Sequence, residues 1–208
     1  MSVSGEVEFG AGLHGIVQGD GRRGVAVISH GAGRGMDAPL LERTAERLAE
    51  LGLASLRWNF GYLGKRPAPS AGGKREVEEL RQAIALMAEY GRPILIGKSF
   101  GARVSSYVAA GRDDLAGLVF YGLPLQGLGR NARPRDWSHL EHIAAPMLFI
   151  TGNHDALCPL ERLAEVQRPI APACTSVVVQ GDHSYKPRGE AEALEHCLMW
   201  VRELISAP

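Results

Sequence analysis

The sequence feature that most constrains the fold is a serine placed between two glycines directly after an apolar run. Residues 93–96 read Pro-Ile-Leu-Ile, and Gly97-Lys98-Ser99-Phe100-Gly101 follows at once. A helical pattern begins at Phe100, so the chain passes from a buried strand through one sharp turn into a helix. The glycines let strand and helix approach closely, while the turn holds Ser99 in a strained conformation at the sheet edge.

The motif on its own is weak evidence for chemistry. In a glycine-rich chain of this length, a G-x-S-x-G pattern arises by chance with a probability of roughly 0.2. Serine is also a favourable capping residue, so the alternative role of Ser99 is to cap the following helix. The strand before the motif and the helix after it favour a nucleophile elbow, because that context presents a serine hydroxyl for reaction.

The rest of the chain alternates short apolar runs with helical patterns. Strands are predicted at Val25–Ile28, Leu53–Trp58, Pro93–Ile96, Leu118–Tyr121, Met147–Thr151 and Ser176–Val179, and Gly10–Val17 is a candidate edge strand. Helices are predicted at Pro39–Leu51, Lys74–Tyr90, Phe100–Ala110, Leu160–Gln167 and Glu190–Ile205. The predicted fold class is therefore α/β, with a mostly parallel central sheet and helices on both faces.

We predict a single domain over residues 1–208, because a chain of this length suits one core. Two stretches, Gly61–Gly73 and Gly122–Asp136, are loop-like, and neither is long enough for a second domain. No large lid domain is expected, so the site should lie open at the carboxyl ends of the strands.

Composition excludes several classes of partner. Lys plus Arg and Asp plus Glu both number 23, so the formal net charge is zero and indicates neither nucleic acid nor an anionic membrane. The apolar runs are too short to span a bilayer, and Met1–Gly10 lacks the pattern of a signal peptide. The 3 cysteines without CxxC spacing indicate no disulfide framework, so a cytoplasmic location is predicted. The oligomeric state is left open.

Two later residues complete the chemistry that a serine requires. A serine hydroxyl needs a base to take its proton, and the base needs an acid to fix its tautomer. Asp155 follows the run ending at Thr151, and His183 follows the run ending at Val179. We therefore predict a catalytic triad in which Ser99 is the nucleophile, His183 the base and Asp155 the acid, in the chain order Ser, Asp, His.

Nearby polar residues are assigned structural roles. His154 and Asp182 adjoin the predicted acid and base, where neighbouring side chains diverge, so we interpret them as loop and turn residues. His139 and His142 have a helical spacing that would bring them together on a metal, but no carboxylate–histidine signature accompanies them. Neither a metal nor an organic cofactor is predicted.

A glycine-rich loop after the first predicted strand suits an oxyanion hole. The strand beginning at Val25 ends in His-Gly-Ala-Gly-Arg-Gly at residues 30–35. Such a loop donates a backbone N–H to developing negative charge, and the amide after the nucleophile donates another. We predict that these donors are Ala32 and Phe100. The alternative of a phosphate-binding loop fits neither the G-x-x-x-x-G-K-[ST] nor the GxGxxG spacing.

Aromatic residues after the second predicted strand would reach the same edge. Trp58, Phe60 and Tyr62, together with His30, are predicted to line a substrate pocket. For Trp58 a position in the core is an equal alternative. Lys98 within the elbow either lowers the cost of nearby negative charge or points to solvent.

Taken together, the motifs resemble a known family. His30-Gly-Ala-Gly33, Arg57-Trp-Asn-Phe60, the GKSFG elbow, Gly152-x-x-Asp155-x-x-x-Pro159 and Asp182-His183-Ser184 occur in order over nearly the whole chain. They look like the small, lidless α/β hydrolases related to dienelactone hydrolase, and most closely like a group with GKSxG elbows. The resemblance implies the α/β-hydrolase fold and the triad but no particular substrate. True dienelactone hydrolases carry a cysteine nucleophile where this chain has Ser99, which argues against dienelactone chemistry.

Two functions are compatible with these residues. The first is a serine hydrolase that cleaves a small or medium carboxylic ester or thioester through an acyl-enzyme intermediate. The second is a non-catalytic binding or scaffold protein that keeps the fold, because the resembling group includes proteins thought to be subunits of larger assemblies. The complete set of Ser99, Asp155 and His183 favours the hydrolase, since a scaffold has no chemical need for all three.

Overall fold

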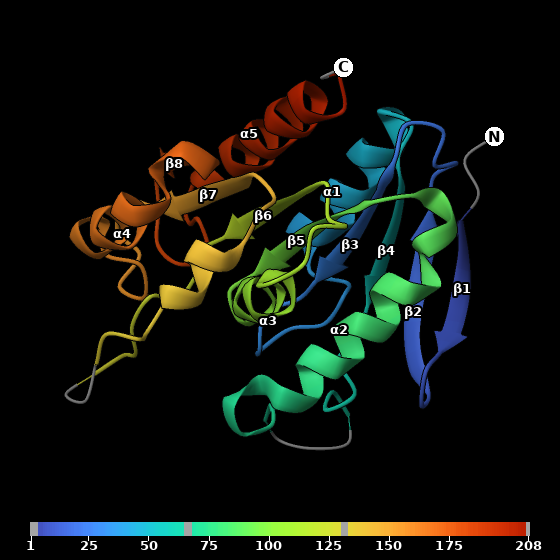
Figure 1. The fold of residues 1–208 in the computed structure, drawn as a ribbon, viewed down its shortest axis with the longest axis horizontal. Coiled ribbons are helices and arrows are strands. Elements are labelled where there is room, and N and C mark those ends of the chain that lie inside the picture. Colours follow the sequence, from blue (N-terminus) through green and yellow to red (C-terminus); the bar gives the residue numbers. More distant parts are fainter. Residues whose placement is uncertain (1–3, 65–67, 130–132, 207–208) are drawn as a thin grey trace.

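The strands form one sheet that runs through the molecule (Figure 1). The computed structural model describes residues 4–64, 68–129 and 133–206, and within them the sheet has eight strands. The strands are β1 Ser4–Phe9, β2 Leu13–Gln18, β3 Val25–Ser29, β4 Ala54–Trp58, β5 Pro93–Lys98, β6 Gly117–Tyr121, β7 Met147–Gly152 and β8 Cys174–Val179. Their spatial order is β1-β2-β4-β3-β5-β6-β7-β8. Strands β3 to β8 pair in parallel, whereas β2 pairs antiparallel with both β1 and β4. The mostly parallel sheet is therefore confirmed.

Helices cover both faces of this sheet (Figure 1). They are α1 Pro39–Glu50, α2 Lys74–Leu86, α3 Phe100–Ala109, α4 Leu160–Gln167 and α5 Gly189–Leu204, with short 3-10 segments at Ala71–Gly73, Ala88–Tyr90, Ser138–His142 and Arg168–Ala173. Apolar residues of α1 and α5 pack in one core, and those of α2, α3 and α4 in the other.

The strands divide their side chains between the two cores. In β3, Val25 and Val27 join the core under α2 and α3, while Ala26 and Ile28 join the core under α1 and α5. Every residue of β3 is buried. The reason is that side chains alternate across a strand and both faces of this sheet are covered. The continuous apolar runs in the sequence follow from this double coverage.

The edge of the sheet differs from the sequence prediction. The range Gly10–Val17 was expected to form an edge strand, but β2 lies inside the sheet between β1 and β4. The edge strand on this side of the sheet is instead β1, which forms a hairpin with β2, and the opposite edge strand is β8. Glycines at positive φ, Gly10 and Gly12, make the tight turn, and charged residues of β1 alternate with apolar ones. That alternation is typical of an edge strand with one exposed face.

The remaining elements differ from the predicted ranges mainly at their ends. The helix predicted over Lys74–Tyr90 stops at Leu86 and continues as the 3-10 segment Ala88–Tyr90. The connections after β4 and β6 contain, in their described parts, only a 3-10 segment each and one isolated bridge between Gln126 and Pro134, so no lid domain is built there. Residues 65–67 and 130–132 of the two predicted loops lie outside the described ranges. No helix within those ranges is long and apolar enough to cross a bilayer.

Candidate active site

Ser99 stands at the sharp turn between β5 and α3. Its backbone has φ 53° and ψ −108°, which is an unfavourable conformation for a residue with a side chain. A methyl group on Gly97 would lie 2.4 Å from the Ala102 nitrogen, and one on Gly101 would lie 2.4 Å from the Ser29 oxygen. No side chain fits at either position, so the glycines of the motif are required for the strand and the helix to cross this closely.

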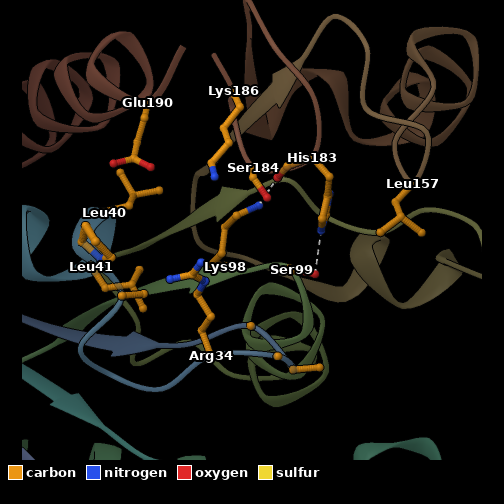
Figure 2. A pocket seen from close by; sticks show the side chains of 15 residues that line it. Arg34, Leu40, Leu41, Lys98, Ser99, Leu157, His183, Ser184, Lys186 and Glu190 are labelled. Atoms are coloured by element: carbon orange, nitrogen blue, oxygen red, sulfur yellow. Dashed lines mark hydrogen bonds between the residues drawn. The ribbon is translucent and has the colours of Figure 1, made fainter. Parts of the chain in front are cut away.

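Three side chains from separate elements form one hydrogen-bonded chain. The Ser99 Oγ lies 2.8 Å from His183 Nε2 (Figure 2), and His183 Nδ1 lies 2.7 Å from Asp155 Oδ2. Ser99 follows β5, Asp155 follows β7 and His183 follows β8, so all three meet at the carboxyl edge of the sheet. With the Nδ1 proton donated to the carboxylate, Nε2 is free to accept the serine proton.

The carboxylate of Asp155 is held rigidly. The residue is only 4% exposed, and its Oδ1 accepts the Leu157 N–H at 2.8 Å. The loops after β7 and β8 are joined directly, because Gly181 N–H donates to Asn153 Oδ1 at 2.9 Å and His154 N–H donates to the Gly181 carbonyl at 2.9 Å. Asp155 and His183 are therefore carried by two loops that are bonded to each other.

The neighbouring polar residues take structural positions. His154 is exposed, and the carboxylate of Asp182 accepts the backbone N–H groups of Ser184 and Lys186, so it shapes the turn as predicted. His139 Nε2 lies 2.9 Å from the Ser106 Oγ on α3.

Of the two predicted oxyanion donors, Ala32 lies in the glycine-rich loop after β3 and Phe100 directly follows Ser99. Phe100 is the first residue of α3, where a backbone N–H has no partner within the helix. Ala32 lines the pocket described below, in a loop that approaches the elbow closely. A methyl group on the adjacent Gly31 would lie 3.5 Å from the Ser99 Cβ. Their role as oxyanion donors stays a prediction.

The four residues predicted to line a substrate pocket do not line it. His30 and Trp58 are fully buried, and Phe60 and Tyr62 are 1% and 4% exposed. They pack against one another and against Phe100, with ring centroids 4.9 Å apart for His30 and Phe60 and 5.4 Å apart for Phe60 and Phe100. Apolar rings gain more by packing under the loops than by facing water, so this part of the prediction is corrected.

These buried aromatic residues hold the glycine-rich loop in place through hydrogen bonds. The His30 imidazole lies 2.7 Å from the Gly31 carbonyl through Nδ1 and accepts the Phe60 N–H through Nε2 at 3.0 Å. Burial lowers the pKa of His30 to about 4, although the bond to Gly31 opposes this change, so the ring is neutral near pH 7. The Tyr62 hydroxyl donates to the Ala32 carbonyl at 3.2 Å. The loop is thus anchored on both sides of the predicted oxyanion donor.

Figure 2 shows the pocket beside Ser99 and His183. Its volume is about 520 Å³. Its walls come from the glycine-rich loop, the start of α1, the elbow and the loops after β7 and β8. Arg34, Leu40, Leu41, Leu157 and Lys186 line it, and sequence reasoning missed all five. A signal for the α1 residues existed, because a helix beginning at Pro39 soon after the glycine-rich loop must start at the same sheet edge.

The fold and the hydrogen-bonded chain define an α/β protein with a Ser–His–Asp site at the carboxyl edge of its sheet. The chain belongs to the alpha/beta hydrolase domain family, whose model matches residues 22–203. The match covers every element from the end of the β1–β2 hairpin to α5. Membership in the narrower group related to dienelactone hydrolase stays a prediction.

Solved structures share this fold. An alpha-beta serine hydrolase homologue from Coxiella burnetii is 24% identical, with a TM-score of 0.70 over 98% of this chain and 95% of the other. An esterase from Pyrococcus furiosus is 17% identical, with a TM-score of 0.76 over 99% and 92% of the two chains. A monoacylglycerol lipase from Paleococcus ferrophilus is 17% identical, with a TM-score of 0.76 over 92% and 99%.

The crossing of β5 and α3 yields the first testable prediction. Replacing Gly101 by Ala should lower the free energy of unfolding by about 1–3 kcal/mol or more, because the new methyl group meets the Ser29 carbonyl. Thermal unfolding measures the effect. Gly5→Ala is the matched control, since a methyl group there meets nothing within 4 Å. Equal melting temperatures for both variants would contradict the close crossing.

Proposed function

We propose that this chain is a serine hydrolase that cleaves a small or medium carboxylic ester or thioester through an acyl-enzyme intermediate. The observation that carries the proposal is the hydrogen-bonded chain from Ser99 through His183 to Asp155, with distances of 2.8 and 2.7 Å. A serine hydroxyl within reach of a neutral imidazole, itself oriented by a buried carboxylate, is an activated nucleophile.

In the first half of the reaction, Ser99 Oγ attacks the substrate carbonyl carbon while His183 Nε2 takes the hydroxyl proton. Asp155 accepts the Nδ1–H throughout and stabilises the imidazolium without becoming protonated. His183 then gives the proton to the leaving alcohol or thiol as the bond to it breaks. The product of this half is an ester between Ser99 and the acyl group.

In the second half, water attacks the acyl-enzyme and His183 takes the water proton. The proton returns to Ser99 Oγ as the carboxylic acid leaves, so the enzyme is regenerated. In both halves negative charge builds up on the carbonyl oxygen, and the amides of Ala32 and Phe100 would hold it. A single such donor commonly contributes about 10²–10³ in turnover.

The pocket supports a substrate of modest size. A volume of about 520 Å³ falls within the range of about 300–1,000 Å³ that is usual for small-molecule sites. Leu40, Leu41 and Leu157 offer an apolar wall for an acyl chain or an alcohol. The side chains of Arg34 and Lys186 also face the pocket (Figure 2), so a substrate with a negative group fits the charge of the wall.

The alternative function is a binding or scaffold protein that retains the fold. Such a protein does not need the positive φ of Ser99, which costs about 1–3 kcal/mol in strained conformations of this kind. It also does not need a buried carboxylate aligned on a histidine. The combination favours catalysis, and covalent labelling separates the two functions.

The nucleophile is tested with a fluorophosphonate probe. We expect a single adduct on Ser99, because its hydroxyl lies 2.8 Å from His183 Nε2, which can take its proton. Peptide mapping by mass spectrometry identifies the modified residue, and Ser99→Ala serves as the unlabelled control. A protein that takes up no probe, or carries it on another serine, would support the scaffold function.

The acid is tested with Asp155→Asn. Asparagine still offers Oδ1 to the Leu157 N–H, so the loop should fold, but its amide would present a donor to His183 Nδ1. We expect turnover to fall by about 10³–10⁴ because the imidazole is held in the wrong tautomer. Steady-state kinetics with circular dichroism measure both properties. Nearly unchanged turnover would mean that Asp155 only shapes its loop.

The charge of the pocket is tested with two 4-nitrophenyl esters of equal chain length, one neutral and one ending in a carboxylate. Arg34 and Lys186 take part in none of the ion pairs found among the described residues, whereas Glu190 pairs with Arg43. We expect kcat/KM to favour the anionic ester, and Arg34→Gln to reduce this preference about two- to fivefold, as for an exposed ion pair. Arg202→Gln, a remote exposed change on α5, is the control. A preference for the neutral ester would contradict this reading of the pocket.

A further inference from the structure

Lys98 places a positive charge directly beside the predicted base. It is the last residue of β5, immediately before Ser99. It lies on the same strand face as Ile96, which packs in the core under α1 and α5. Its Nζ donates to the main-chain carbonyl of His183 at 2.5 Å (Figure 2). The same ammonium lies 4.8 Å from the ring centroid of Tyr185. Lys98 thus connects the elbow to the loop after β8 at His183 and at Tyr185.

The ammonium also lies close to the bond between acid and base. A methyl group built on Gly122 would lie 2.9 Å from Lys98 Nζ, 3.3 Å from Asp155 Oδ2 and 3.3 Å from His183 Cε1. The three groups therefore converge on one point at the end of β6. Gly122 has φ 62° and no side chain, which leaves this space to them.

The Tyr185 ring beside Lys98 is itself held in a fixed position. Tyr185 is 1% exposed, and its hydroxyl donates to the Ile150 carbonyl of β7 at 2.9 Å. A cation over an aromatic face is attracted to the ring, more strongly when both are withdrawn from water. The Lys98 head group therefore has a defined position, between a fixed ring and the carbonyl of the residue that carries the imidazole.

We propose that Lys98 is a positioning residue for the catalytic base: its ammonium holds the main chain of His183 so that the imidazole meets both Ser99 and Asp155, and full activity requires the charged form of Lys98. The inference rests on the proposed hydrolase function. It assigns a role to the lysine of the GKS elbow that is separate from nucleophile, base and acid.

The surroundings of Lys98 make the charge sensitive to pH. Burial lowers the pKa of Lys98 to about 8, and the nearby Asp155, Asp182 and Cys158 oppose this change. The other titratable groups nearest to it are His183 and Tyr185, and Arg34, Lys186 and Glu190 line the same pocket. Burial raises the pKa of Cys158 to about 12 and that of Tyr185 well above its ordinary value, so neither ionises in the same range.

The direction of the pH effect follows from the lowered pKa of Lys98. Below about pH 8 Lys98 carries its proton and makes a charge-assisted bond to the His183 carbonyl. Above that pH the amine becomes neutral, and a neutral hydrogen bond is roughly half as strong. The hold on the base should therefore weaken on the alkaline side.

The experiment compares the parent with Lys98→Met, which keeps a flexible apolar stem but has neither charge nor donor. The rate of Ser99 labelling by a fluorophosphonate and the kcat and KM for a neutral 4-nitrophenyl ester are measured from pH 6 to pH 10. At pH 7 we expect labelling and kcat to fall about 10- to 100-fold, with KM nearly unchanged, because a misplaced reacting group costs rate. Lys74→Met, an exposed lysine at the start of α2, is the matched control.

The pH profile separates positioning from a merely structural role. The parent should lose rate as pH rises through about 8, whereas Lys98→Met should lack this alkaline fall and approach the parent rate at high pH. Lys98→Arg keeps its charge over the whole pH range, so it should also lack the alkaline fall. This variant tests the positioning role if Lys98→Met does not fold. Parent-like rates in Lys98→Met, or an unchanged alkaline fall in Lys98→Arg, would overturn the inference. A parent that is never labelled would overturn the proposed function itself.

Discussion

The close crossing of β5 and α3 is the constraint on which the site is built. At Gly97 and Gly101 the two elements approach so closely that a methyl group would lie 2.4 Å from backbone atoms. This crossing forces the chain between them through a single residue at φ 53°, and that residue is Ser99. Strain of this kind costs about 1–3 kcal/mol and persists only because buried elements on both sides hold it. β5, which is buried from Pro93 to Gly97, and the largely buried α3 provide that support.

The parallel sheet then brings the remaining groups to the serine. Strands β5, β6, β7 and β8 lie side by side and end at the same edge, so residues far apart in the chain meet there. The meeting is made rigid by bonds between loops. The Gly181 N–H is held by Asn153, the Asp155 carboxylate is held by the Leu157 N–H, and Lys98 reaches across to the His183 carbonyl. The geometry of Ser99, Asp155 and His183 therefore depends on three loops that bond to one another. Two of them follow the largely buried β5 and β7, and the third follows the edge strand β8.

Buried aromatic residues also hold the glycine-rich loop in place. His30, Phe60 and Tyr62 were expected to face a substrate, yet they form a buried aromatic group whose polar atoms bind the backbone of the loop above. Polar groups that are buried need hydrogen-bond partners, and here the Gly31 and Ala32 carbonyls and the Phe60 N–H supply them. The wall of the pocket comes instead from the start of α1 and from the loop after β8, with Arg34 and Lys186 adding positive charge.

The sequence by itself determined the α/β architecture, because apolar runs of strand length alternating with helical patterns are stable only as a sheet covered on both faces. It also determined which residues stand just after β5, β7 and β8, since Ser99, Asp155 and His183 each follow one of these runs within four residues. Only the tertiary structure decided how side chains near that edge divide between core and pocket. Trp58 and Lys98 are each the last residue of a strand, yet Trp58 is buried in the core and Lys98 binds the main-chain carbonyl of His183. The reason is that local pattern fixes the face and position of a residue along a strand, whereas its contacts depend on which distant loops the fold places against it.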